Sequence, residues 1–132
     1  MTPPLAPAML GAVAAGGAVG AVLRYLTVSL VGHLWHGAFP WGTLAVNVLG
    51  SFLMGVVVRA AAVAWTPPAE LRAFVVVGLL GAFTTFSTFS LDVWFLAERQ
   101  QYASAAAYTA ASVVLSVAGL VAGILLTRWV TA

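Results

Sequence analysis

The sequence consists almost entirely of four long apolar stretches, separated by short polar or turn-forming segments. We predict helices over residues of about 8–31, 41–65, 69–97 and 102–130. A helix of about 20 mostly apolar residues crosses the roughly 30 Å hydrocarbon core of a bilayer. Because every stretch reaches that length, we expect an all-α protein. Its single domain, residues 1–132, would cross the lipid bilayer four times.

The composition excludes a water-soluble fold. Only 6% of the residues are charged and 63% are hydrophobic, whereas soluble domains carry about 25% charged residues. The basic side chains are scattered along the chain: Arg24, Arg59, Arg72, Arg99 and Arg128. A nucleic-acid-binding protein gathers such residues on one face, so we expect no nucleic-acid partner. The chain contains no Cys, which excludes cysteine chemistry.

An even number of spans would place both chain ends on the same side of the membrane. Arg59, Arg72 and Arg128 would lie on that side, and Arg99 and at most Arg24 on the other. The positive-inside rule needs a clear imbalance of Lys and Arg to fix the orientation. This chain supplies little imbalance, so we predict insertion in both orientations. A four-helix chain of this size is also too small to enclose a solute pathway alone, and we expect a homodimer.

A polar stripe interrupts the second apolar stretch. Thr43, Asn47 and Ser51 are spaced by four residues and share one face of a helix. A single Asn in a membrane helix often only links two helices by hydrogen bonding. Thr and Ser on the same face favour the alternative that Asn47 and Thr43 line a hydrated path.

The fourth stretch carries a second polar stripe. Ser104, Tyr108, Ser112 and Ser116 recur every four residues and lie roughly on one face. Each Ser hydroxyl can also bond back to its own helix, but four polar groups in register favour a continuous track. All of these donors are uncharged, which suits a small anion better than a metal ion.

Hydroxyl and aromatic side chains crowd the middle of the third stretch. Residues 83–90 hold five hydroxyl groups and three Phe, shortly after Gly78 and Gly81. Ser and Thr compete for backbone hydrogen bonds, and Gly weakens a helix interior. We therefore predict a break in the helix between Gly81 and Thr85. Non-helical backbone at membrane depth has to be satisfied by protein, water or an ion.

Arg24 in the first stretch leaves two alternatives open. Its long side chain can reach the membrane surface, or its charge can stay inside the protein at a pore vestibule or a subunit interface. Nearby glycines allow close helix packing, within one chain or between two.

The residue types favour an anion path over three other functions. Enzymatic activity is not expected, because no base lies near a Ser nucleophile. A small exporter, the main alternative, needs a membrane carboxylate, and Asp92 near the end of its span is the sole candidate. A purely structural role leaves the polar midspan unexplained. Neutral donors can replace the hydration of a small anion, and the positively polarised edges of Phe rings can contact it.

Three segments, residues 17–25, 42–52 and 78–92, resemble the motifs of the Fluc or CrcB family of fluoride channels, and the resemblance extends over all four helices. It implies an antiparallel, dual-topology homodimer with two fluoride pores in a bacterial inner membrane. Such a channel lets toxic fluoride leave the cell passively. The resemblance also implies a structural Na⁺ at the dimer centre, bound by backbone carbonyl groups of Gly81 and Thr84 from both subunits.

The same resemblance implies roles for further residues. The fluoride-contacting rings of the family match Phe86 and Phe89, and its pore Asn matches Asn47. Its polar track matches side chains of the third and fourth helices: Thr88, Tyr108, Ser112 and Ser116.

The resemblance says less about the roles of three other positions in the motifs. The family's helix-one Arg matches Arg24, whereas Phe83 occupies a motif position to which we assign no pore role. The family often has Glu where this chain has Asp92, and we carry over no role to Asp92.

Overall fold

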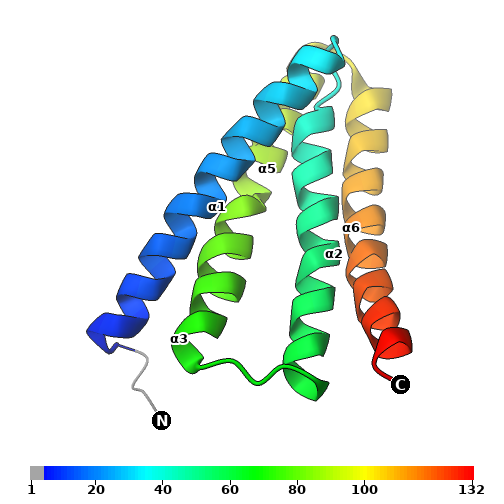
Figure 1. The fold of residues 1–132 in the computed structure, drawn as a ribbon. Helices are drawn as coiled ribbons and strands as arrows, with labels where there is room; N and C mark the ends of the chain where they lie inside the picture. The colour runs from blue at the N-terminus through cyan, green and yellow to red at the C-terminus, as the bar shows by residue number, and fades with distance from the viewer. Residues whose placement is uncertain (1–4) are drawn as a thin grey trace.

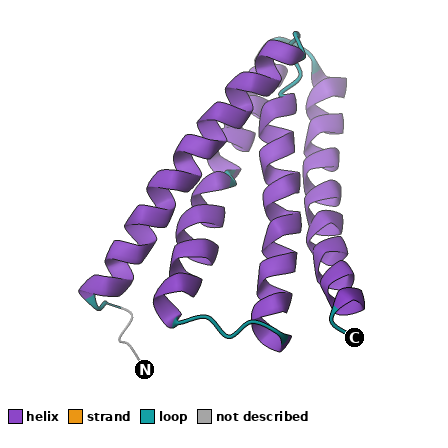
Figure 2. Ribbon diagram, viewed as in Figure 1, coloured by secondary structure: helices purple, strands orange, loops and turns teal. Residues whose placement is uncertain are grey.

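The computed structural model describes residues 5–132, and these form a bundle of four helical spans (Figure 1 and Figure 2). The first span is α1 (Pro7–Leu34), the second is α2 (Trp41–Val63) and the fourth is α6 (Tyr102–Val130). The third, Ala69–Glu98, is composite. It contains α3 (Ala69–Arg72), the π-helix η1 (Ala73–Leu80), α4 (Gly81–Phe83) and α5 (Phe86–Glu98). All four spans are long and apolar enough to cross a membrane, which confirms the predicted fold class.

Prolines and turn conformations set the ends of the helices. Pro7 is the first residue of α1, and Pro40 and Pro68 immediately precede α2 and α3. Proline suits these positions because its φ angle is already helical and its missing N–H would have no partner there. Gly37, between α1 and α2, has a φ of 143°, which a side chain would strongly disfavour. The observed bounds differ from the predicted ones by no more than three residues.

The spans run up and down through the bundle. Figure 1 shows the start of α1, the α2–α3 connection and the end of α6 at one end, with the other two connections at the opposite end. This arrangement confirms that the two ends of the described chain lie on the same side. α2 packs along α6, whereas α1 packs along η1 and α4.

Glycines bring these paired helices into backbone contact. A methyl group added to Gly20 of α1 would overlap the carbonyl oxygen of Leu79 in η1. One added to Gly55 of α2 would overlap that of Leu120 in α6. Lipid tails are as apolar as the side chains, so membrane helices associate mainly through such close packing. These glycines therefore pack within the chain.

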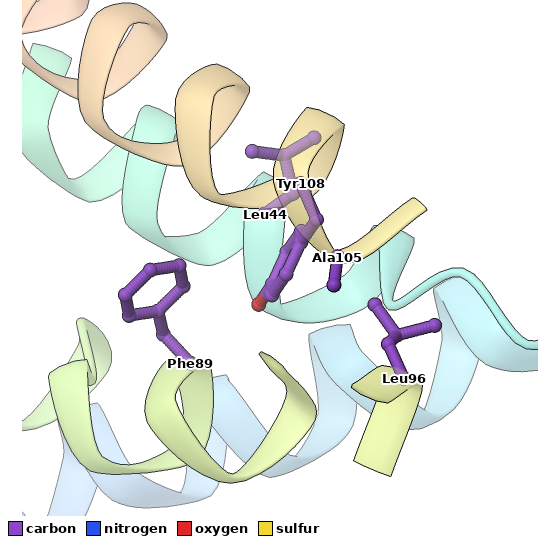
Figure 3. Close-up of a cluster of buried hydrophobic side chains, with 5 residues drawn as sticks. All are labelled: Leu44, Phe89, Leu96, Ala105 and Tyr108. Carbon is purple, nitrogen blue, oxygen red and sulfur yellow. The ribbon is translucent and has the colours of Figure 1, made fainter. Parts of the chain in front are cut away.

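The bundle is apolar outside and partly polar inside. Large apolar side chains such as Leu26 and Val114 are exposed, whereas the polar residues Thr43, Thr85 and Ser112 are buried. One buried apolar cluster lies between α2, α5 and α6 (Figure 3): Leu44, Phe89, Leu96, Ala105 and Tyr108. This distribution is the one expected where lipid replaces water as the surrounding solvent.

Candidate functional site at the helix break

The third span is interrupted by two residues of extended backbone. α4 ends at Phe83, Thr84 has φ −84° and ψ 158°, and Thr85 has φ −155° and ψ 117°. α5 then begins at Phe86. The predicted break between Gly81 and Thr85 is therefore confirmed. The preceding π-helix was not predicted.

The side-chain amide of Asn47 holds the break. Its Oδ1 accepts a hydrogen bond of 2.7 Å from the backbone N–H of Thr85, and its Nδ2 donates one of 3.0 Å to the Thr85 carbonyl oxygen. One side chain of α2 thus satisfies both backbone groups of a residue that has left the helix, as membrane depth requires. We call this pair of bonds the Asn47 clamp. It leaves the second N–H of Nδ2 available.

The clamp also frees a carbonyl group. In a continuous α-helix the N–H of Thr85 would bond to the carbonyl oxygen of Gly81, but here it bonds to Asn47. The carbonyl oxygen of Leu80, in contrast, accepts from both the N–H and the Oγ1 of Thr84, each at 3.1 Å. Gly81 itself is exposed. Its carbonyl is therefore a candidate ligand for a cation.

Thr85 gives α5 its starting direction. Its Oγ1 accepts a bond of 3.2 Å from the N–H of Thr88 and donates one of 3.1 Å to Thr88 Oγ1. Sequence reasoning missed Thr85 as a site residue. The signal was present, because Thr is a favoured residue immediately before a helix and the break was predicted here.

A cavity of about 260 Å³ lies beside the break. It brings together side chains of α2, α5 and α6 with the backbone of the break: Asn47, Ser51, Thr84, Thr85, Phe86, Phe89, Ser112, Val113, Ser116 and Val117. The Oγ of Ser112 is buried and has no hydrogen-bond partner within residues 5–132. A buried hydroxyl without a partner is costly, so Ser112 is a candidate hydrogen-bond donor to a ligand at this cavity.

Two phenylalanines border the cavity in different settings. The ring centroids of Phe86 and Phe89 are 5.2 Å apart, and Phe89 lies 5.3 Å from Tyr108. Phe89 belongs to the buried cluster of Figure 3, whereas Phe86 is 77% exposed. Phe86 therefore forms the rim of the cavity and Phe89 its inner wall.

A second polar region adjoins this cavity. The Tyr108 hydroxyl donates a hydrogen bond of 3.0 Å to Oδ2 of Asp92, and Figure 3 shows the Tyr108 ring beside Phe89. Thr43 is buried and, with Asp92, lines a separate cavity of about 220 Å³. Within the described residues, no group of three or more His, Asp or Glu side chains is placed to hold a metal ion.

The predicted site residues fall into two groups. Asn47, Phe86, Phe89, Ser112 and Ser116 line the central cavity, joined by Ser51 and Thr84. Outside the lining lie four predicted polar residues: Thr43, Thr88, Ser104 and Tyr108.

Arg24 lies on the inner side of α1. It is half-buried and four residues from both Gly20 and Val28. Gly20 packs against η1, and Val28 packs against Gly42 of α2. Residues at this spacing share a face, so the Arg24 stem lies toward the bundle.

Comparison with known proteins gives the family. Residues 11–124 match the family described as CrcB-like protein, Camphor Resistance (CrcB). The chain is 58% identical over 120 residues to the fluoride-specific ion channel FluC of Rhodospirillum centenum, an alignment covering 91% of this chain and 95% of that protein. The protein of the same name from Nitrobacter winogradskyi is 55% identical over 117 residues, covering 89% and 93%. With its four spans, the chain is a multi-pass membrane protein that belongs to the CrcB-like family.

Proposed function

We propose that the chain is a fluoride channel that lets fluoride cross a bacterial inner membrane passively. The observation that carries this proposal is the cavity at the break, where the buried Ser112 hydroxyl has no partner in the described chain. The two relatives named above are both fluoride-specific channels by name. The alternative of a small exporter finds no support in them, and we assign the chain no catalytic step.

Fluoride would exchange its water shell for protein groups one at a time. The free N–H of Asn47 and the hydroxyls of Ser51, Ser112 and Ser116 are neutral donors around one small volume. The edges of Phe86 and Phe89 add positive polarisation without a full charge. Among the described residues, no charged side chain lines this cavity. Binding to neutral groups alone is weak enough to allow release as well as entry.

The track would continue past Phe89 to Tyr108 and Thr43. Tyr108 bridges the two polar regions, because its ring contacts Phe89 and its hydroxyl bonds to Asp92. Thr88 would serve both the break and the track. Its hydroxyl oxygen accepts a bond from Thr85, and its own O–H would remain to donate to fluoride.

The pore would be completed by a second, antiparallel copy of the chain in a dual-topology homodimer. Phe86, Val113 and Val117 all line the cavity and are all exposed, so one wall of the cavity is missing in a single chain. A partner surface would supply that wall, and a symmetric pair would contain two such paths.

A structural Na⁺ would lie where the two breaks meet. The Gly81 carbonyl released by the Asn47 clamp and the extended Thr84 are the groups that support this site, and carbonyl oxygens at broken membrane helices are known cation ligands. Replacing Na⁺ by a large organic cation should weaken the dimer or its fluoride flux. Equal dimer stability and equal flux in both salts would contradict the Na⁺ site.

The function is tested with the purified protein in liposomes, by following fluoride and chloride efflux with ion-selective electrodes. We expect fluoride efflux that needs no proton gradient, and little chloride efflux. Fluoride efflux no faster than from empty liposomes would overturn the proposal. Efflux that depends on a proton gradient would favour the exporter instead.

A further inference from the structure

Asp92 borders two cavities at the end of the bundle that holds the α1–α2 connection. Their volumes are about 220 Å³ and about 180 Å³. The hydrogen bond at the Asp92 carboxylate comes from Tyr108 and reaches Oδ2. Within residues 5–132, Oδ1 receives no side-chain hydrogen bond. A half-buried carboxylate needs more compensation than one hydroxyl provides, so Asp92 is a candidate partner for a cation.

Three aromatic residues line the larger of these cavities. Trp35, Phe39 and Trp41 all contribute to its lining, and the ring centroids of Phe39 and Trp41 are 4.4 Å apart. Phe39 also lies 5.5 Å from Tyr108, in an edge-to-face arrangement. Aromatic faces attract cations, and cages of aromatic rings are the usual recognition sites for quaternary ammonium groups.

The charges around the larger cavity agree with this chemistry. Among the described residues that line it, Asp92 is the only charged one. Arg99 borders only the smaller cavity and is exposed, as are His33, His36 and Glu98 at the same end of the bundle. A small metal ion would need several oxygen ligands, whereas the side-chain oxygens of this lining come from Asp92 and Thr43.

We propose that this cavity binds a small quaternary ammonium group, held by the Asp92 carboxylate and the rings of Trp35, Phe39 and Trp41. The ligand is either a free cation or the choline headgroup of a lipid. This site goes beyond the proposed channel function, because its occupancy can be measured without transport. The bound cation lies beside Tyr108 and Asp92, at one end of the polar track, and obstructs fluoride there.

Tetramethylammonium chloride is the probe, titrated into a constant background of NaCl so that Na⁺ is never removed, and equal additions of NaCl are the reference. Intrinsic Trp fluorescence of the full chain in a maltoside detergent reports binding, and fluoride efflux from phosphatidylglycerol vesicles reports obstruction. We expect a saturable fluorescence change and slower efflux. Asp92→Asn should raise the half-effect concentration more than about tenfold, because it removes a unit charge beside the cation. The control Glu98→Gln removes an exposed acid at the same end and should respond like the original chain.

The proposal is overturned if tetramethylammonium acts no differently from Na⁺, or if Asp92→Asn responds like the original chain. If Asp92→Asn does not elute as folded protein, Trp35→Leu replaces it and should also weaken binding, since it removes one ring and keeps the carboxylate. Repeating the titration in phosphatidylcholine vesicles identifies the ligand's source. A weaker response there assigns the site to the lipid headgroup, and an equal response to a free cation. If the protein shows no fluoride flux, the fluorescence titration still tests whether the cavity binds tetramethylammonium.

Discussion

The two halves of the third span have the same direction and different surroundings. Before the break, α3, η1 and α4 are mostly apolar and pack against α1, where Gly78 meets the backbone at Val13 and Gly16. After the break, α5 packs against α6 and α2. Its first residue, Phe86, is 77% exposed.

The two halves of the third span therefore have different roles: the first half anchors the span against α1, and the second half faces the cavity where the ion would bind. At Gly78 the first half contacts the α1 backbone so closely that no side chain would fit. The second half presents Phe and hydroxyl side chains to a cavity. The Asn47 clamp joins the halves, because it holds Thr85 immediately before α5. Substitutions in the three places should therefore affect stability and fluoride flux in different proportions.

The largest effect is expected in the first half. Gly78→Val places a side chain against the α1 backbone, where even one carbon atom at this position would lie 2.7 Å from the Val13 carbonyl oxygen. We expect a loss of about 3 kcal/mol or more in the free energy of unfolding, seen as little folded protein in size-exclusion chromatography. Gly17→Val is the matched control, since Gly17 has open space around it. Equal yields of the two variants would contradict the anchoring role.

The second-largest effect on stability is expected at the Asn47 clamp. Asn47→Ala leaves the N–H and carbonyl groups of Thr85 without their partner, which should lower the free energy of unfolding by about 2–4 kcal/mol. Fluoride flux should fall in the same variant, as measured in liposomes containing equal amounts of folded protein. Ser51→Ala, on the same face of α2, serves as the control and should change stability little. A stable Asn47→Ala protein would show that the break does not depend on the clamp.

The two cavity phenylalanines should separate flux from stability. Phe89→Ile replaces a buried ring and should cost about 1 kcal/mol, whereas exposed Phe86→Ile should change stability by less than about 0.5 kcal/mol. Both should reduce fluoride flux, because both lose a positively polarised ring edge. Thermal unfolding and electrode recordings on the same preparations test this. Normal flux in folded Phe86→Ile would count against the ring-edge mechanism.

The smallest effect on stability is expected at Ser112. Its Oγ has no partner in the described chain, so Ser112→Ala removes an unsatisfied group and should leave stability unchanged or slightly higher. Fluoride flux should nevertheless fall, since one donor in the cavity is lost. Thr127→Ala is a useful comparison, because the Thr127 hydroxyl is buried on α6 but bonds to the Gly123 carbonyl of its own helix. If flux falls equally in both variants, Ser112 has no special role.

The architecture could be predicted from the sequence because apolar length alone identifies membrane spans. The break could also be predicted, since Gly and hydroxyl residues cluster there. The π-helix could not, because no composition distinguishes Ala73–Leu80 from an ordinary apolar helix. The π-helix contains Gly78, which packs against the backbone of α1. That packing is a tertiary contact, and no local sequence pattern reports it.

Spacing predicted which side chains share a helix face but not which of them meet the cavity. Ser112 and Ser116 line it, whereas Ser104 lies about 12 Å from Ser112 along α6. The hydroxyl of Thr88 is bonded to Thr85 because Thr88 falls in the first turn after the break. The pairing of Asn47 with Thr85 joins residues 38 positions apart, and no local pattern indicates it.

The start of α1 and the end of α6 lie at the same end of the bundle, which has a practical consequence for protein engineering. A short linker from the end of α6 in one copy to the start of α1 in another keeps both copies in the same orientation, because these two helix ends lie at one end of the bundle. A single polypeptide containing two oppositely oriented copies needs an added membrane-crossing segment between them. Gene fusions with and without that segment would therefore produce antiparallel or parallel pairs by design.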